Sequence, residues 1–204
     1  LLISPVSFAE EPPQVRTRLQ PAHYPQTLKL ERPDVDTLGK AQFFHLAVTY
    51  YLGQGVPKDR GEAVRWFKRA AAAGDALSRY DLAILYRDGD GVEADAAESL
   101  RWFIKAGNSG SVDAQVHLGW MYQTGAGVPV SLTLARMWYE KAVDTSPYAL
   151  NNYAVLQAYG EGVPQDGKAA LLSFQIASRK GLSAGCLNVG LMYELGIGRA
   201  AAPG

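Results

Sequence analysis

The sequence predicts an all-α protein in which pairs of helices repeat along the chain and stack into a solenoid. Four near-copies of one phrase carry this prediction, and a shortened fifth follows them: "GQGVPKD" at 53–59, "GDGVEAD" at 89–95, "GAGVPVS" at 125–131, "GEGVPQD" at 160–166 and "GIG" at 196–198. The second glycine of each phrase lies 35 or 36 residues from the next. A fixed period of about 20 to 50 residues is typical of solenoids, in which each unit buries its apolar face against its neighbours.

Each unit is predicted to contain two helices. In the stretch 75–89, "DALSRYDLAILYRDG", the apolar side chains follow helical rather than alternating spacing. In the stretch 61–74, "GEAVRWFKRAAAAG", they form one stripe that includes Trp66 and Phe67. The same aromatic pair recurs in later units as Trp102–Phe103 and Trp138–Tyr139. We expect the tryptophans to lie in the core between repeats rather than to form a stacking surface for bases or sugars.

The glycine phrases are predicted to be turns between the two helices of a unit. The first glycine of each phrase is expected to end the first helix, because glycine takes the left-handed conformation without a Cβ clash. Asp59 and Asp95 stand where the second helix begins. Glu62 and Glu98 follow three residues later and complete the pattern of a reciprocal capping box. Since a nucleotide site needs one glycine loop after a strand, the fivefold recurrence argues against phosphate binding.

The full pattern resembles the Sel-1-like repeat, a relative of the tetratricopeptide repeat. In the third unit, the residues that carry the resemblance are Ala114, Leu118, Gly119, Tyr122, Gly125, Gly127, Val128, Ala135, Trp138, Tyr139, Lys141 and Ala142. The resemblance covers residues 38–200 and implies a right-handed α/α superhelical solenoid of tetratricopeptide-like helix pairs. It also implies a non-catalytic scaffold or adaptor that holds a protein or peptide partner on its concave face. The fourth unit departs from the pattern, with Gln157 in place of the tyrosine and Ser173 in place of the tryptophan.

The predicted array spans residues 37–200 and contains four full repeats and a final half. The repeats are expected at 39–74, 75–110, 111–146 and 147–181, and the half repeat at 182–200. Residues 201–204 are expected to form a short tail. Because no second helix follows the half repeat, an alternative is that the chain is a fragment of a longer array whose remaining repeats carry the partner site.

The N-terminal residues are predicted to lie outside the array. Residues 1–9 are apolar and place Ser7 and Ala9 where a signal peptidase requires small side chains, so we expect the remnant of a secretory signal peptide cut before Glu10. The alternative is a mildly apolar end of an internal fragment. Residues 10–36 are rich in proline and are expected to form an extended arm. A signal peptide implies a periplasmic or secreted protein, and the cytoplasm is the alternative location.

Composition argues against several other functional classes. The 204 residues include 20 basic and 20 acidic side chains, so the chain offers no net positive field for nucleic acid. No apolar run reaches the roughly 18 residues of a membrane-spanning helix. The single cysteine, Cys186, excludes an intramolecular disulfide framework and a cysteine-rich zinc site, and we expect an inert thiol. No arrangement of serine, histidine and carboxylate residues fits a catalytic site, so neither enzyme activity nor a cofactor is expected.

The candidate binding residues lie at matching positions of the first helices. One set, which we call the polar row, consists of His45, Asp81, His117, Asn152 and Asn188. We expect these side chains to be solvated or hydrogen-bonded between repeats rather than to bind a metal ion. The reason is that helices packed about 10 Å apart are too distant to share one ion.

Trp120 stands out beside the polar row, because the other repeats carry smaller apolar residues at its position. Three residues further along the first helices, Tyr51, Arg87 and Gln123 vary as a surface that reads a partner would. We therefore predict partner binding on the concave face by His45, Tyr51, Asp81, Arg87, His117, Trp120, Gln123 and Asn152. The alternative for Trp120 is packing between repeats or beneath the N-terminal arm. The alternative function is an accessory of an envelope enzyme, or a carbohydrate-binding or hydrolase-like protein.

Overall fold

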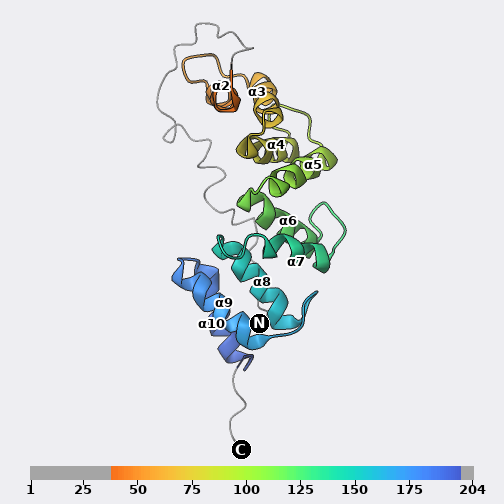
Figure 1. The fold of residues 1–204 in the computed structure, drawn as a ribbon, viewed down its shortest axis with the longest axis vertical. Coiled ribbons are helices and arrows are strands. Elements are labelled where there is room, and N and C mark those ends of the chain that lie inside the picture. Colours follow the sequence, from red (N-terminus) through yellow and green to blue (C-terminus); the bar gives the residue numbers. More distant parts are fainter. Residues whose placement is uncertain (1–37, 199–204) are drawn as a thin grey trace, which may run out of the picture. The chain divides into compact units, whose positions relative to one another are not determined.

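The computed structural model describes residues 38–198, and every regular element in that range is an α-helix (Figure 1). The helices are α2 (Lys40–Leu52), α3 (Arg60–Ala72), α4 (Ala76–Asp88), α5 (Ala96–Asn108), α6 (Val112–Thr124), α7 (Leu132–Glu140), α8 (Pro147–Tyr159), α9 (Gly167–Arg179) and α10 (Ser183–Glu194). The predicted all-α class is confirmed for this range. The predicted signal remnant at 1–9, the arm at 10–36 and the tail at 201–204 lie outside the described residues.

The chain divides into two compact units, and the division falls inside α6. In residues 38–114, α2 packs on α3, α3 on α4, and α4 on α5. In residues 115–198, α7 packs on α8, α8 on α9, and α9 on α10. Within each unit, helices that follow one another in the sequence therefore lie against each other, as repeated helix pairs require.

Aromatic side chains of the second helices form the centre of each core. The residues that follow the tryptophan position are all 0% exposed: Phe67, Phe103, Tyr139 and Phe174. The tryptophans themselves fit the core prediction only in part, because Trp138 is buried whereas Trp66 and Trp102 are half-buried. A cation covers each half-buried ring, with Arg69 at 4.7 Å from the centre of Trp66 and Lys105 at 4.0 Å from that of Trp102. These two tryptophans thus lie at the border of the apolar stripe rather than at its centre.

The aspartates predicted to cap the second helices do so in α3 and α5. Asp59 accepts a hydrogen bond from the backbone nitrogen of Glu62 at 2.9 Å, and Asp95 accepts one from that of Glu98 at 2.9 Å. The second part of the predicted capping box, a hydrogen bond from the backbone nitrogen of the aspartate to the glutamate side chain, is wrong for α3 and α5. The carboxylates of Glu62 and Glu98 instead form ion pairs with the arginine three residues further along, at 2.8 and 2.7 Å. The aspartates therefore cap these helices without help from the glutamates.

The predicted left-handed glycines are also found at the ends of first helices. Gly53, Gly89 and Gly160 have φ angles of 74°, 68° and 75° and cap α2, α4 and α8. The second glycine of a phrase is more constrained than the first. Gly91 has a φ of 78°, and a Cβ atom there would lie 2.4 Å from the carbonyl oxygen of Arg60. The turn after α4 thus packs directly on the start of α3, at a distance that only glycine permits.

Candidate functional site

Most of the polar row lies inside the protein. Asp81, His117, Asn152 and Asn188 are only 3%, 2%, 1% and 2% exposed, respectively, whereas His45 is half-buried. Of the two expectations for the row, solvation or hydrogen bonding between repeats, burial excludes solvation for four of its five members. A partner that docks on the folded protein meets other side chains at these positions.

In residues 115–198, the polar row is part of a buried hydrogen-bond chain. Tyr139 of α7 donates its hydroxyl proton to Oε1 of Gln123 in α6 at 2.9 Å and accepts a hydrogen bond from Nδ2 of Asn152 in α8 at 3.3 Å. Asn151 donates to Oδ1 of Asn152 at 3.1 Å, and Asn188 of α10 donates to Oδ1 of Asn151 at 3.0 Å. Burial raises the pKa of Tyr139, against a smaller opposing effect of the Asn152 hydrogen bond, so the phenol stays neutral. These contacts join α6, α7, α8 and α10 and confirm the predicted hydrogen bonding between repeats.

Tyr51 is held by the turn of the following repeat. Its hydroxyl donates to Oδ2 of Asp90 at 2.9 Å, and Asp90 also forms an ion pair with Arg60. The guanidinium of Arg60 lies 4.9 Å from the centre of the Tyr51 ring. Burial and the hydrogen bond to Asp90 raise the pKa of Tyr51 to about 12. This predicted binding residue therefore ties α2, the start of α3 and the turn after α4 together.

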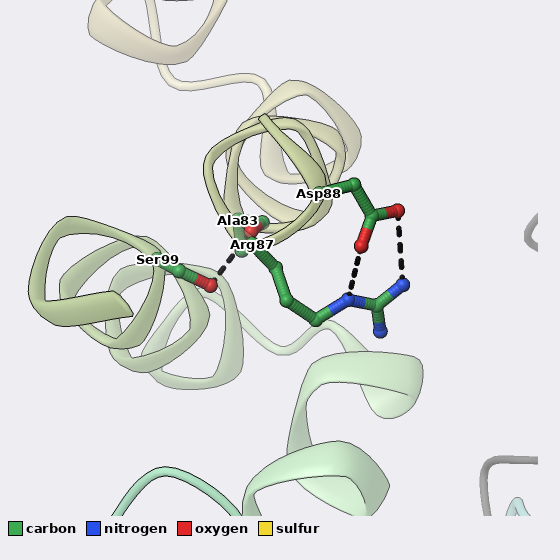
Figure 2. A network of polar contacts seen from close by, with 4 residues as sticks. All are labelled: Ala83, Arg87, Asp88 and Ser99. Carbon is green, nitrogen blue, oxygen red and sulfur yellow. Dashed lines mark hydrogen bonds and ion pairs between the residues drawn. The ribbon is translucent and has the colours of Figure 1, made fainter. Parts of the chain in front are cut away.

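Arg87 is the one exposed residue among the eight predicted binding residues, all of which the structure describes. It lies at the end of α4, and its Nε and Nη2 donate to the two carboxylate oxygens of Asp88 at 2.7 and 3.1 Å (Figure 2). Nearby, Ser99 of α5 donates its hydroxyl proton to the carbonyl oxygen of Ala83 in α4 at 2.7 Å. Arg87 is thus accessible on a helix that is fixed against its neighbour, with part of its charge balanced by Asp88.

Trp120 and Gln123 of α6 are both half-buried. The Trp120 ring meets the buried imidazole of His117 edge to face, with ring centres 5.9 Å apart and planes at 74°. The two residues are three apart on one helix, so the indole is held by its own helix. Of the eight predicted residues, the structure therefore brings His117 into contact with Trp120 and links Gln123 with Asn152 through Tyr139.

The described residues hold no arrangement suited to a metal ion or a membrane span. Between residues 38 and 198, no three histidine, cysteine or carboxylate side chains gather as metal ligands would. Within the same range, no helix has the length and apolarity to cross a bilayer. Cys186 is exposed, and its Sγ contacts the hydroxyl of Ser178.

A pocket in residues 38–114 was missed by the sequence predictions. We call it the α3–α5 pocket. Its volume is about 520 Å³, and it is lined by Ala71, Ala72, Arg79, Trp102, Lys105 and Asn108. The tryptophan position recurs with the repeat and therefore indicated core packing, so this pattern did not indicate that Trp102 also borders a pocket. A usable signal was Arg79, because the matching positions of the other repeats carry Phe43, Gln115, Leu150 and Cys186.

Comparison with known families and solved structures identifies the repeat. A family model described as Sel1 repeat matches residues 44–75, 76–111, 112–144, 147–182 and 183–201. The crystal structure of a Sel1 repeat protein from Oxalobacter formigenes is similar, with a TM-score of 0.71 and 31% identity, over 82% of this chain and 69% of that chain. The crystal structure of a protective antigen present in uropathogenic Escherichia coli strains, which displays an SLR fold, has a TM-score of 0.72 and 31% identity.

The similarity to the Escherichia coli antigen covers 79% of this chain but only 35% of that protein, so the chain spans about a third of that protein's length. None of the curated proteins matches the chain. The Sel1 repeat matches together cover well over half of the sequence, and they coincide with the region in which the structure consists of packed helix pairs. The chain therefore belongs to the Sel1 repeat family.

Proposed function

We propose that this protein is a non-catalytic interaction scaffold that binds a protein or peptide partner on the first helices of its repeats. Sel1 repeat proteins are generally protein-interaction scaffolds. One observation carries the proposal: the five repeat matches follow one another from residue 44 to residue 201. Most of the chain is therefore made of a unit whose usual task in this family is to hold another protein.

Trp120 is the proposed anchor for the partner in residues 115–198. Its indole is held on one side by His117, yet it is only half-buried. A partly accessible tryptophan with a restrained ring provides a large contact area and loses little conformational entropy on binding. Truncation of such an anchor typically costs 2 kcal/mol or more, which corresponds to about a 30-fold loss of affinity.

The test compares two alanine variants of the full chain. A partner is first captured from native cells, identified and purified, and its affinity is then measured by titration calorimetry. Trp120→Ala is expected to weaken binding by about 30-fold or more and to leave the melting temperature nearly unchanged. The matched control is Leu172→Ala, which removes a 54% exposed apolar side chain from a second helix, α9, in the same unit. Unchanged affinity of Trp120→Ala, equal losses in both variants, or collapse of the fold would each contradict the anchor.

Arg87 is proposed as a separate, secondary contact in residues 38–114. It is exposed, so an acidic group of the partner can approach it, and its Nε and Nη2 already donate to Asp88. Arg87→Ala is therefore expected to weaken partner binding by only a few-fold, in line with exposed ion pairs of about 1 kcal/mol or less. A loss as large as that of Trp120→Ala would reverse the proposed order of importance.

A location in the bacterial envelope or outside the cell is part of the proposal. It is supported by the apolar residues 1–9 and by Ser7 and Ala9, which suit signal peptidase cleavage. If the proposal is correct, the protein recovered from the envelope or the medium begins at Glu10 when its N-terminus is sequenced. Recovery from the cytoplasm with residues 1–9 still attached would refute this location.

A further inference from the structure

The α3–α5 pocket combines positive charge with an apolar wall. We propose that it binds a carboxylate group of the partner together with an adjacent apolar group that packs on Trp102. The inference deepens the proposed function and rests on it, because the scaffold's partner supplies the carboxylate. The residues that carry the inference are Arg79, Trp102, Lys105 and Asn108.

Arg79 presents a guanidinium that is already fixed in place. Its Nε donates to the carbonyl oxygen of Ala71 at 3.2 Å, and its Nη1 donates to the hydroxyl of Ser109. A guanidinium has five N–H donors in a rigid fork, so these two contacts leave donors for a ligand. Because the side chain is already ordered, little further rotamer entropy is lost when a carboxylate binds.

Lys105 places a second positive charge on the pocket wall. Its ammonium lies 4.0 Å from the centre of the Trp102 ring, a cation–π distance that restrains an otherwise mobile side chain. Asn108 lines the pocket one turn further along α5 and adds amide donors. The three polar side chains therefore offer donors to the same ligand.

The positive charge of the pocket is not balanced by ion pairs with carboxylates of the described residues, 38–198. Neither Arg79 nor Lys105 forms an ion pair with an acidic residue between residues 38 and 198, whereas several arginines of the same range do. Asp75, four residues before Arg79, accepts a hydrogen bond from the backbone nitrogen of Ser78 at 2.6 Å and caps α4, and Asp81, two residues after Arg79, is only 3% exposed. Two cations in one pocket that have no acidic partner among the residues the structure describes favour an anionic ligand.

The rest of the lining selects what accompanies the anion. Ala71, Ala72 and the Trp102 ring form an apolar wall, and the volume of about 520 Å³ is within the usual range for ligand sites. A carboxylate joined to an aliphatic side chain matches both parts of the pocket. Inorganic phosphate matches only the charged part, which makes it a useful competitor.

A second pocket in residues 115–198 shows how the charge depends on one position. It has a volume of about 380 Å³ and is lined by Gln175, Ser178, Arg179, Cys186 and Val189. There Cys186 occupies the position that matches Arg79, and the lining carries one cation instead of two. We therefore assign carboxylate binding to the α3–α5 pocket and not to this one.

Three short peptides test the pocket in the full chain. Acetyl-Ala-Leu-Glu-amide carries a side-chain carboxylate, acetyl-Ala-Leu carries a terminal carboxylate, and acetyl-Ala-Leu-Gln-amide carries neither. The readout is the indole N–H signal of Trp102 in ¹⁵N-labelled protein, assigned by its loss in Trp102→Phe. The carboxylate peptides are expected to shift this signal saturably and to bind about tenfold more tightly than the amide peptide, the usual effect of one charge-assisted hydrogen bond. Binding of only one carboxylate peptide still supports the site and identifies its source as an acidic side chain or a chain end.

Two variants separate the pocket from a general charge effect. Lys105→Gln is expected to weaken carboxylate binding by about tenfold with an unchanged melting temperature. Lys141→Gln is the matched control, because Lys141 lies 4.3 Å from the ring centre of Trp138 but does not line the pocket, and it should bind the peptides like the unaltered protein. Equal binding of the amide peptide, equal losses in both variants, phosphate binding as tight as the carboxylate peptides, or no saturable shift would overturn the proposal. Since none of these measurements uses the captured partner, their failure leaves the Trp120 experiment intact.

Discussion

Replacement of Tyr139 by phenylalanine tests the buried hydrogen-bond chain without disturbing the packing. The matching positions of the other second helices already hold fully buried phenylalanines: Phe67, Phe103 and Phe174. Tyr139→Phe therefore removes one hydroxyl with its hydrogen bonds to Gln123 at 2.9 Å and to Asn152 at 3.3 Å. Gln123 is half-buried and can bond to water, but Asn152 is 1% exposed, so water does not replace the hydrogen bond that it donated to the hydroxyl.

The expected loss follows from these two environments. Each lost hydrogen bond costs about 0.5–1.5 kcal/mol, so the loss of two in Tyr139→Phe should lower the free energy of unfolding by about 1–3 kcal/mol. Urea unfolding followed by circular dichroism measures this loss, and hydrogen exchange should place it in residues 115–198. The control is Tyr153→Phe, whose partly exposed hydroxyl donates to Glu140 at 3.2 Å and whose removal should change stability by about 0.5 kcal/mol or less. A stability loss no larger for Tyr139→Phe than for the control would refute the hydrogen-bond chain.

Three further predictions concern the turns, the core and the tie at Tyr51. Gly91→Ala should lower the free energy of unfolding by about 2–5 kcal/mol, because the new methyl group clashes with Arg60 and the left-handed backbone is also strained. Gly89→Ala should lower it by only about 1–2 kcal/mol. Equal losses in urea unfolding would disprove the close packing of the turn. Phe103→Ala should lower the free energy of unfolding by about 3–5 kcal/mol, and Trp102→Ala should lower it clearly less, because part of the Trp102 ring is in solvent. The reverse order would contradict the placement of Phe103 at the centre of the core. The raised pKa of Tyr51, about 12 against an ordinary 10.0, means that its contribution to stability is complete below pH 10 and is lost as pH rises through 12. The phenolate absorbance difference between the unaltered protein and Tyr51→Phe should therefore have its midpoint near pH 12, and a midpoint near 10 would contradict the hydrogen bond.

The turns and helix starts could be predicted from the sequence because they obey local rules. Gly89 caps α4 with a φ of 68°, and Asp59 caps α3, as their residue types and positions indicate. The recurrence of these signals at one period was enough to predict the helix pairs and their repetition. The Glu62 side chain shows the limit of local reasoning, because Arg65 on the next turn binds its carboxylate in place of the helix start.

The core needed the tertiary structure, because neighbouring positions on a helix face differ by only about 100°. Trp102 and Phe103 both fit the apolar stripe of α5, and only the packing of adjacent helices decides that Phe103 is fully buried while Trp102 borders a pocket. The arginine that completes this pocket, Arg79, comes from α4. No pattern within α5 alone could have predicted that meeting.

The sequence by itself determined the repeat, its two helices, its turns and the existence of the polar row, since each of these depends on residue type and spacing along one chain. Only the tertiary structure decided which way the row faces. A first helix in a stack has neighbours on more than one side, so the same period is expected for a row in contact with solvent and for a row in contact with the next helix. Asn152 and Asn188 prove to be buried, because Tyr139 and Asn151 on neighbouring helices supply hydrogen-bond partners that make the burial of two amides tolerable.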